Sequence, residues 1–137
     1  MSDEKTIQGG CFCGKVRYEF APEFLAYRYC FCSRCRKLRG TAHAANMFVP
    51  QAGFRWLAGE DQIRRHDLEG TRFGNCFCTT CGSPVPRQAL AGKAWLIPAG
   101  TVDEDPGKLP ESVIFWDSRA SWLPPADGLE KFSEYSK

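Results

Sequence analysis

Three short stretches of the chain share the pattern Cys-Phe-Cys, and two of them continue with two residues and a further cysteine. Cysteines two positions apart on an extended chain present their sulfurs to one face. A Cys-x-x-Cys knuckle clamps a single metal ion. The stretches contain all 8 cysteines of the protein, which are Cys11, Cys13, Cys30, Cys32, Cys35, Cys76, Cys78 and Cys81.

Zinc is the metal that this grouping favours, because it takes four ligands in a tetrahedron and binds thiolate readily. Eight sulfurs would fill two four-cysteine sites, whereas seven would fill one site and leave the other with a vacant corner. Disulfides, an iron–sulfur cluster and inert buried cysteines are the alternatives. Disulfide frameworks use more dispersed cysteines in oxidising compartments, and the cysteine runs of ferredoxins are absent. We therefore expect two zinc ions per chain.

Size and composition limit the function classes further. The length of 137 residues predicts one domain covering 1–137, with an ordinary 43% of hydrophobic residues. A net charge of +2 does not argue for a nucleic-acid or membrane partner. The N-terminal residues are polar, and no apolar run approaches transmembrane length. We expect a cytoplasmic protein, since a reducing compartment preserves thiolates; the sequence does not indicate an oligomeric state.

Short segments of alternating hydrophobicity, separated by glycine and proline, predict a mainly β fold of short antiparallel strands. In the clearest segment, residues 15–20, the side chains of Val16, Tyr18 and Phe20 fall on one face. A turn of helix after Cys32 and a short helical piece near Leu129 are the helices that we expect. Further strands are predicted near residues 25–29, 45–49, 54–57, 95–97 and 113–116.

Glycines follow two of the cysteine pairs, Gly14 after Cys13 and Gly82 after Cys81. Glycine adopts a positive φ without a Cβ penalty, so both positions are predicted to turn the backbone and aim N–H groups at thiolate sulfur. Ordinary turn glycines are the alternative. Both interpretations predict tight turns at these cysteines.

A group of cations follows the second cysteine stretch. Such cations would offset the negative charge of a zinc–thiolate site and attract an anionic ligand, or would form an ordinary solvated face. His43 and His66 match no ligand spacing, and the chain has no glycine-rich dinucleotide fingerprint. The cations are Arg34, Arg36, Lys37 and Arg39.

The cysteine motifs follow one another in a specific order. Residues 9–14 read Gly-Gly-Cys-Phe-Cys-Gly, residues 30–37 read Cys-Phe-Cys-Ser-Arg-Cys-Arg-Lys, and residues 77–84 read Phe-Cys-Thr-Thr-Cys-Gly-Ser-Pro. Together with residues 99–103 and 127–129, this order resembles the glutathione-dependent formaldehyde-activating enzyme (GFA) family over nearly the whole chain. The resemblance implies a β-tent fold built around zinc.

The resemblance also implies the metal sites and the activity. The expected activity is that of a carbon–sulfur lyase, which joins a small thiol such as glutathione to formaldehyde or cleaves the adduct. The fourth corner of the second zinc would accept the thiol. The closed structural site would consist of Cys11, Cys13, Cys78 and Cys81, and the second, catalytic zinc would be held by Cys30, Cys32 and Cys35.

Two positions depart from the family pattern. Phe31 stands where the family commonly has histidine, and Cys76 is an additional thiol. If Cys76 reached the second zinc, that site would be a closed Cys₄ site. The chain would then be a zinc-stabilised interaction module without catalysis; otherwise Cys76 is a spare buried thiol. A nucleic-acid binder is a third alternative, disfavoured by the near-neutral charge.

Overall fold

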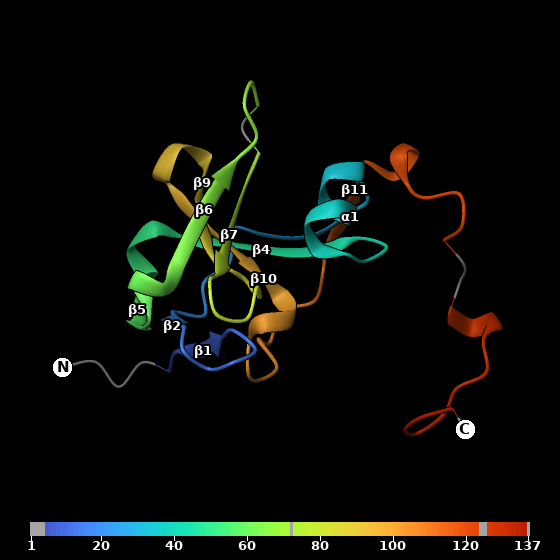
Figure 1. The fold of residues 1–137 in the computed structure, drawn as a ribbon, viewed down its shortest axis with the longest axis horizontal. Helices are drawn as coiled ribbons and strands as arrows, with labels where there is room; N and C mark the ends of the chain where they lie inside the picture. Colours follow the sequence, from blue (N-terminus) through green and yellow to red (C-terminus); the bar gives the residue numbers. More distant parts are fainter. Residues whose placement is uncertain (1–4, 72, 124–125, 137) are drawn as a thin grey trace.

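The computed structural model describes residues 5–71, 73–123 and 126–136, and strands dominate its regular structure. These strands form three small sheets, which confirms the mainly β prediction (Figure 1). None of the described helices is long and apolar enough to cross a membrane. Short 3-10 helical turns connect the strands at Gln51–Gly53, Glu60–Gln62, Leu90–Gly92, Ala99–Thr101, Trp116–Ser118 and Ala126–Gly128.

The first sheet has the order β1-β2-β5, with β1 at Ile7–Gly10, β2 at Arg17–Phe20 and β5 at Phe54–Ala58. Both pairings are antiparallel. As predicted from the alternation, Val16, Tyr18 and Phe20 are fully buried. The ring of Tyr18 stacks on that of Phe54 at 5.7 Å between centroids, so the sheet is held from its inner face.

The second sheet has the order β11-β3-β4-β10-β9. Most of its strands were predicted, but the segment 113–116 is a strand only to Ile114, and Phe115 turns away with a φ of 56°. β11 also pairs parallel to β3, unlike the antiparallel pairing that we expected. The bounds are β3 Ala26–Cys30, β4 Ala44–Pro50, β9 Arg87–Ala89, β10 Ala94–Pro98 and β11 Ser112–Ile114.

The third sheet has the order β6-β7-β8, with β6 at Ile63–Asp67, β7 at Gly74–Cys78 and β8 at Pro84–Val85. Its strands, like β1 and β9, were not predicted. β6 is rich in charge and lacks the alternation of apolar residues that marked the predicted strands. β7 alternates strictly between buried and half-buried residues, and this places Cys76 and Cys78 on one face.

The helix α1 spans Ser33–Arg39 and begins where β3 ends, as the sequence predicted. Cys32 is its N-cap, with the sulfur accepting from the backbone N–H of Cys35 at 3.4 Å. Gly40 ends the helix in the left-handed region, at a φ of 63°, and donates its N–H to the carbonyl of Arg36. The cysteines of the second stretch therefore lie at a strand-to-helix junction.

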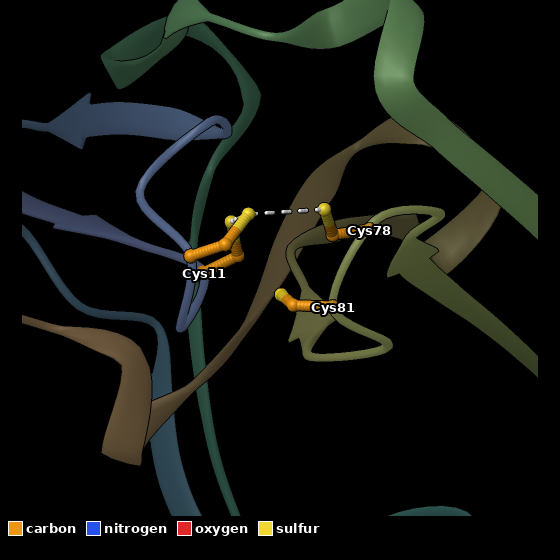
Figure 2. Close-up of side chains that lie close together, drawn as sticks. Cys11, Cys78 and Cys81 are labelled. Carbon is orange, nitrogen blue, oxygen red and sulfur yellow. Dashed lines mark hydrogen bonds between the residues drawn. The ribbon is translucent and has the colours of Figure 1, made fainter.

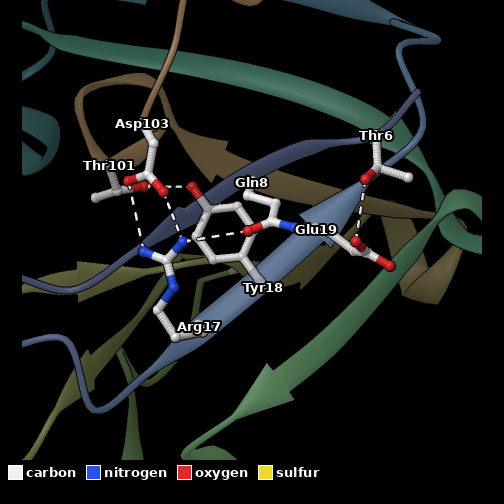
Figure 3. A network of polar contacts seen from close by, with 7 residues as sticks. All are labelled: Thr6, Gln8, Arg17, Tyr18, Glu19, Thr101 and Asp103. Carbon is white, nitrogen blue, oxygen red and sulfur yellow. Dashed lines mark hydrogen bonds and ion pairs between the residues drawn. The ribbon is translucent and has the colours of Figure 1, made fainter.

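A polar network fastens the first sheet to the segment after β10 (Figure 3). Arg17 Nη2 pairs with Asp103 Oδ2 at 2.6 Å, and the hydroxyl groups of Tyr18 and Thr101 lie 2.6 Å apart. A Cβ on Gly9 would clash with the Tyr18 hydroxyl, so this close approach requires glycine. The network fixes the strands on either side of the first cysteine pair.

Packing of the first two sheets against each other creates the main core. The core contains aromatic and aliphatic side chains from five of their strands. A separate apolar cluster underlies the third sheet and includes Val16 and Val85 together with cysteines. The buried residues of the main core are Ile7, Tyr18, Phe20, Tyr27, Met47, Val49 and Ile97.

Candidate metal centres

The fold gathers the cysteines into two groups, in each of which all sulfurs lie within 4.8 Å of one another. All cysteines are free thiols. The groups match the sets that the family resemblance implied, while metal ligation itself stays a prediction. They are Cys11, Cys13, Cys78 and Cys81, called here the four-cysteine cluster, and Cys30, Cys32 and Cys35, called the three-cysteine cluster.

The four-cysteine cluster joins distant parts of the chain. Cys11 and Cys13 lie in the loop between β1 and β2, and Cys78 and Cys81 lie at the end of β7 and in the turn that follows (Figure 2). The sulfurs of Cys11 and Cys13 are 3.6 Å apart, and those of Cys13 and Cys78 are 3.8 Å apart. A tetrahedron of sulfurs placed about 2.3 Å from zinc has edges of about 3.8 Å, so this donor set fits the metal.

Two tight turns hold these sulfurs in place. Gly14 has a φ of 84° and Gly82 a φ of 76°, which confirms the positive φ predicted at both glycines. Their N–H groups donate to the carbonyls of Cys11 and Cys78, respectively, and so close the turns. The N–H of Val16 donates to the sulfur of Cys11 at 3.3 Å. The backbone thus stabilises negative charge on that sulfur.

The charge on the four-cysteine cluster is unevenly distributed. Burial opposes ionisation of Cys11, but hydrogen bonds from the Val16 N–H and from neighbouring thiols lower its pKa to about 6. The Lys15 N–H lowers the pKa of Cys13, yet desolvation and the neighbouring sulfurs outweigh it and raise that pKa to about 11. Several thiolates therefore need a cation to coexist here, and Zn²⁺ would supply that charge.

The three-cysteine cluster forms at the junction of β3 and α1. Cys30 ends β3, Cys32 caps the helix, and Cys35 lies in its first turn. The sulfurs of Cys30 and Cys32 are 3.4 Å apart. Cys30 and Cys35 are buried, whereas Cys32 is half-buried. Phe73 and Ile114 pack against the cluster and shield it from water.

Ionisation of the three-cysteine cluster is also selective. Burial raises the pKa of Cys30 and of Cys35. Burial acts in the same direction on Cys32, but the Cys35 N–H and the neighbouring thiols outweigh it and lower the Cys32 pKa. Three thiolates in this space again require a cation, which a metal with three protein ligands would provide.

Cys76 belongs to neither group of clustered sulfurs. It lies on the same face of β7 as Cys78 and packs with Cys11, Val16 and Val85 in the core under the third sheet. Burial raises its pKa. The cysteine that could have closed the second site is therefore a buried thiol outside the three-cysteine cluster, which has no fourth cysteine among the described residues.

The cations after the second cysteine stretch have separate roles. Arg36 is used by the fold, because its Nη1 donates to the carbonyls of Phe31 and Ser118 at 3.2 and 2.8 Å. Arg34 lies over the ring of Phe73, and Arg34, Lys37 and Phe73 line one surface hollow. Arg39 is half-buried and lines a small cavity with Cys35. Arg39 thus shares a cavity with a cysteine of the three-cysteine cluster.

Sequence reasoning missed Arg87, which lies on β9 and lines the same cavity as Arg39 and Cys35. Burial lowers the pKa of both arginines. The charge of Arg87 lowers the pKa of Arg39 further, and the charge of Arg65 does the same to the pKa of Arg87. The pairing of β9 with β10 brings Arg87 to this place, and no motif in the sequence marks it.

Phe31 is buried, in place of the histidine common in the family, and its ring lies 5.0 Å from that of Trp116 and 4.7 Å from that of His43. His43 also stacks on Tyr29, at 4.4 Å. An aromatic cluster therefore fills the space beside the three-cysteine cluster. An imidazole is still present in it, at position 43.

Comparisons with known proteins agree with this arrangement. The structure is similar to a crystal structure of a Rhodobacter sphaeroides protein, with a TM-score of 0.61 and 25% sequence identity. The match covers 77% of this chain and 97% of that one. The model of the family described as glutathione-dependent formaldehyde-activating enzyme matches residues 6–118, which include both cysteine clusters. The chain therefore belongs to the glutathione-dependent formaldehyde-activating enzyme family.

Proposed function

We propose that the protein binds two zinc ions and adds a small thiol, glutathione in the first instance, to formaldehyde. The four-cysteine cluster holds one ion as a structural site. The three-cysteine cluster holds the other with three sulfurs and leaves its fourth position to the thiol. The supporting observation is that Cys30, Cys32 and Cys35 lie together without a fourth cysteine. Family membership supports the reaction class.

The reaction conserves all atoms of its two substrates. The thiol sulfur attacks the carbonyl carbon, a carbon–sulfur bond forms, and the carbonyl π electrons move to oxygen. The thiol proton ends on that oxygen, which gives S-hydroxymethylglutathione without a leaving group. The reverse direction is a carbon–sulfur lyase reaction. Zinc bound at this site would favour the thiolate form of the substrate.

The protein contributes position and electrostatics to this reaction. Backbone N–H donation to Cys32 and the closely packed Phe73 hold the three sulfurs in place. The guanidinium groups of Arg39 and Arg87, which line the cavity beside Cys35, favour negative charge there. Burial of Cys30 and Cys35 limits access of water and strengthens these interactions.

A cobalt-substituted protein tests this function directly. Titration with glutathione should change the cobalt absorption spectrum, since the thiol sulfur enters the coordination shell of one of the two metals. S-Methylglutathione, which has no free thiol, is the control and should not produce this change. A cobalt spectrum that glutathione leaves unaltered would contradict the open site and, with it, the proposed reaction.

The non-catalytic interaction module is the alternative, and it needs a second site closed by the protein. Cys76 does not provide that closure, because it lies outside the three-cysteine cluster. Reduced thiols at both clusters are suited to a reducing compartment, so the proposal places the protein in the cytoplasm.

A further inference from the structure

Residues 126–136, called here the tail, leave their large apolar side chains exposed. The tail runs away from the sheets and from α1 (Figure 1). Leu129, Phe132 and Tyr135 are exposed, and none of them belongs to an apolar cluster of the described residues. The tail also lies beyond residues 6–118, which the family model matches. Apolar groups gathered on one exposed segment indicate a surface for interaction.

Acidic residues alternate with these apolar side chains. The tail contains Asp127, Glu130 and Glu134, and its one basic residue is Lys131. All residues from 127 to 136 are exposed. The apolar groups therefore carry negative charge beside them, and the surface that fits the tail is an apolar hollow edged with cations.

A hollow of about 340 Å³ beside α1 has this character. A dry cavity of about 150 Å³ holds one benzene molecule, so this hollow has room for about two side chains of that size. Leu38, Leu68 and Phe73 line it with apolar surface, while the exposed Arg34 and Lys37 give it a cationic rim. The other described residues that line the hollow, none of them acidic, are Ser33, His66 and Gly74.

The chain approaches this hollow just before the tail and then leads away from it. Arg36 Nη1 donates to the carbonyl of Ser118, and Trp122 lines a neighbouring hollow together with Lys37. Beyond these contacts the tail leaves α1, and no tail residue lines the hollow of its own chain (Figure 1). Such a tail reaches the matching hollow of a second copy without reversing its course. Exchange of identical segments is a low-cost route to a two-fold dimer.

We propose that the protein forms a dimer in which the tail of each protomer binds the hollow beside α1 of the other. The side chains of Leu129 and Phe132 enter the hollow, and the acids on either side of Phe132 lie at its cationic rim. The two contacts are small, so the dimer dissociates on dilution and weakens as salt screens the charges. The inference does not rest on the proposed function, because it uses no cluster cysteine and no metal.

Analytical ultracentrifugation of the purified, metal-loaded protein from about 1 to about 100 µM tests the dimer. The wild-type protein should pass from monomer to dimer over this range. Phe132→Ser should raise the dissociation constant at least about tenfold, because it removes the aromatic anchor of the contact. Leu109→Ser is the matched control. It also removes a large exposed apolar side chain, but outside the tail and the hollow, and should leave the dissociation constant unchanged.

A charge exchange tests which surfaces meet. Lys37→Glu and Glu134→Lys should each weaken the dimer, because each brings like charges together at the rim of the hollow. Both substitutions in one chain should restore much of the affinity, since the attraction returns with its signs exchanged. Both positions are exposed, so neither substitution disturbs the core.

Three results would overturn the proposal. The first is a chain that stays monomeric at about 100 µM, which is also what a tail bound to its own hollow would give. The second is a dimer that Phe132→Ser leaves unaltered, since the contact would then lie elsewhere. The third is a double charge variant that dimerises no more tightly than the single variants, because the tail would then not bind at this rim.

Discussion

Cys76 is the residue whose position decides between an open and a closed second site. It is buried on β7 and packs under the four-cysteine cluster, but its sulfur belongs to neither cluster. With this geometry, a metal ion in either cluster would be bound by the cysteines of that cluster and not by Cys76. The additional thiol that departs from the family pattern is then a small core side chain.

Cys76→Ser should leave the zinc content unchanged, because the substitution removes no sulfur from either cluster. Elemental analysis of the purified variant measures this directly. Cys35→Ser is the comparison and should lose about one equivalent of zinc, since it removes one of three ligands. Loss of one equivalent from Cys76→Ser would instead show that this thiol closes the second site.

Several residues of the site could be predicted from the sequence, and others could not. The cysteines and Gly14 could be predicted as site residues from their residue types and short spacing, because a metal knuckle requires that local pattern whatever the rest of the fold. Arg87 carries no such signal, because the pairing of β9 with β10 alone brings it to the cavity that Arg39 lines. Cys76 was ambiguous for the same reason, since strand alternation gives its face but not what lies opposite.

At the scale of elements, the β1-β2-β5 sheet has one buried carboxylate, Glu19, at its centre. Arg55 Nε donates to Glu19 Oε2 at 2.5 Å across the β2–β5 pair, and Thr6 donates to Oε1. The hydrogen bond with Arg55 is the largest cause of a lowered pKa at Glu19. The ionised carboxylate thus joins neighbouring strands.

Glu19→Gln should lower the free energy of unfolding at neutral pH by about 1 kcal/mol, because Arg55 is largely exposed and the ion pair is screened. A lowered folded-state pKa stabilises the protein above the ordinary carboxyl pKa. This contribution disappears as the pH falls through the lowered value. Denaturant unfolding at pH 7 and at pH 3 measures the difference between variant and wild type, which should shrink in acid.

Glu23→Gln is the control, because Glu23 is exposed and its side chain takes no part in the pair of Glu19 with Arg55. Its effect should be small at both pH values. A Glu19→Gln effect that stayed the same in acid would show that the loss is one of packing and not of charge.

The strands themselves illustrate what periodicity detects. The segments that became β2, β4 and β10 have dense β-formers and one or both faces in the core, so the sequence pattern predicted them. β6 was missed because four of its five residues are exposed. The parallel β11–β3 pair was missed too, since sequence pattern contains no information on which distant strand becomes a neighbour.

At the scale of the molecule, the four-cysteine cluster acts as a cross-link. Cys13 and Cys78 are 65 positions apart in sequence, yet their sulfurs lie within contact distance. A cross-link that closes a loop of this length stabilises the folded state by about 4 kcal/mol in the chain-entropy model. The metal at this cluster should therefore hold the first and third sheets together.

Cys81→Ser should lower the melting temperature by about 10 °C or more, because it removes a ligand from this cross-link. Differential scanning calorimetry measures the change, and addition of a strong chelator to the wild-type protein should reproduce it. Cys76→Ala, which also loses a thiol from the same stretch, is the control and should melt much closer to wild type, because it removes no cluster sulfur and buries no hydroxyl group. Equal melting of Cys81→Ser and wild type would rule out a stabilising metal at this cluster.

The parallel strand β11 has a further consequence for how the protein is made. β11 flanks β3, the carbonyl of Ile114 accepts from the N–H of Phe31, and the carbonyl of Ser118 accepts from Arg36. A ribosome releases the three-cysteine stretch long before it releases these late supports. During synthesis the cysteines of the second site therefore leave the ribosome before β11 does, and the surroundings of that site become complete only after residues 112–118 have followed.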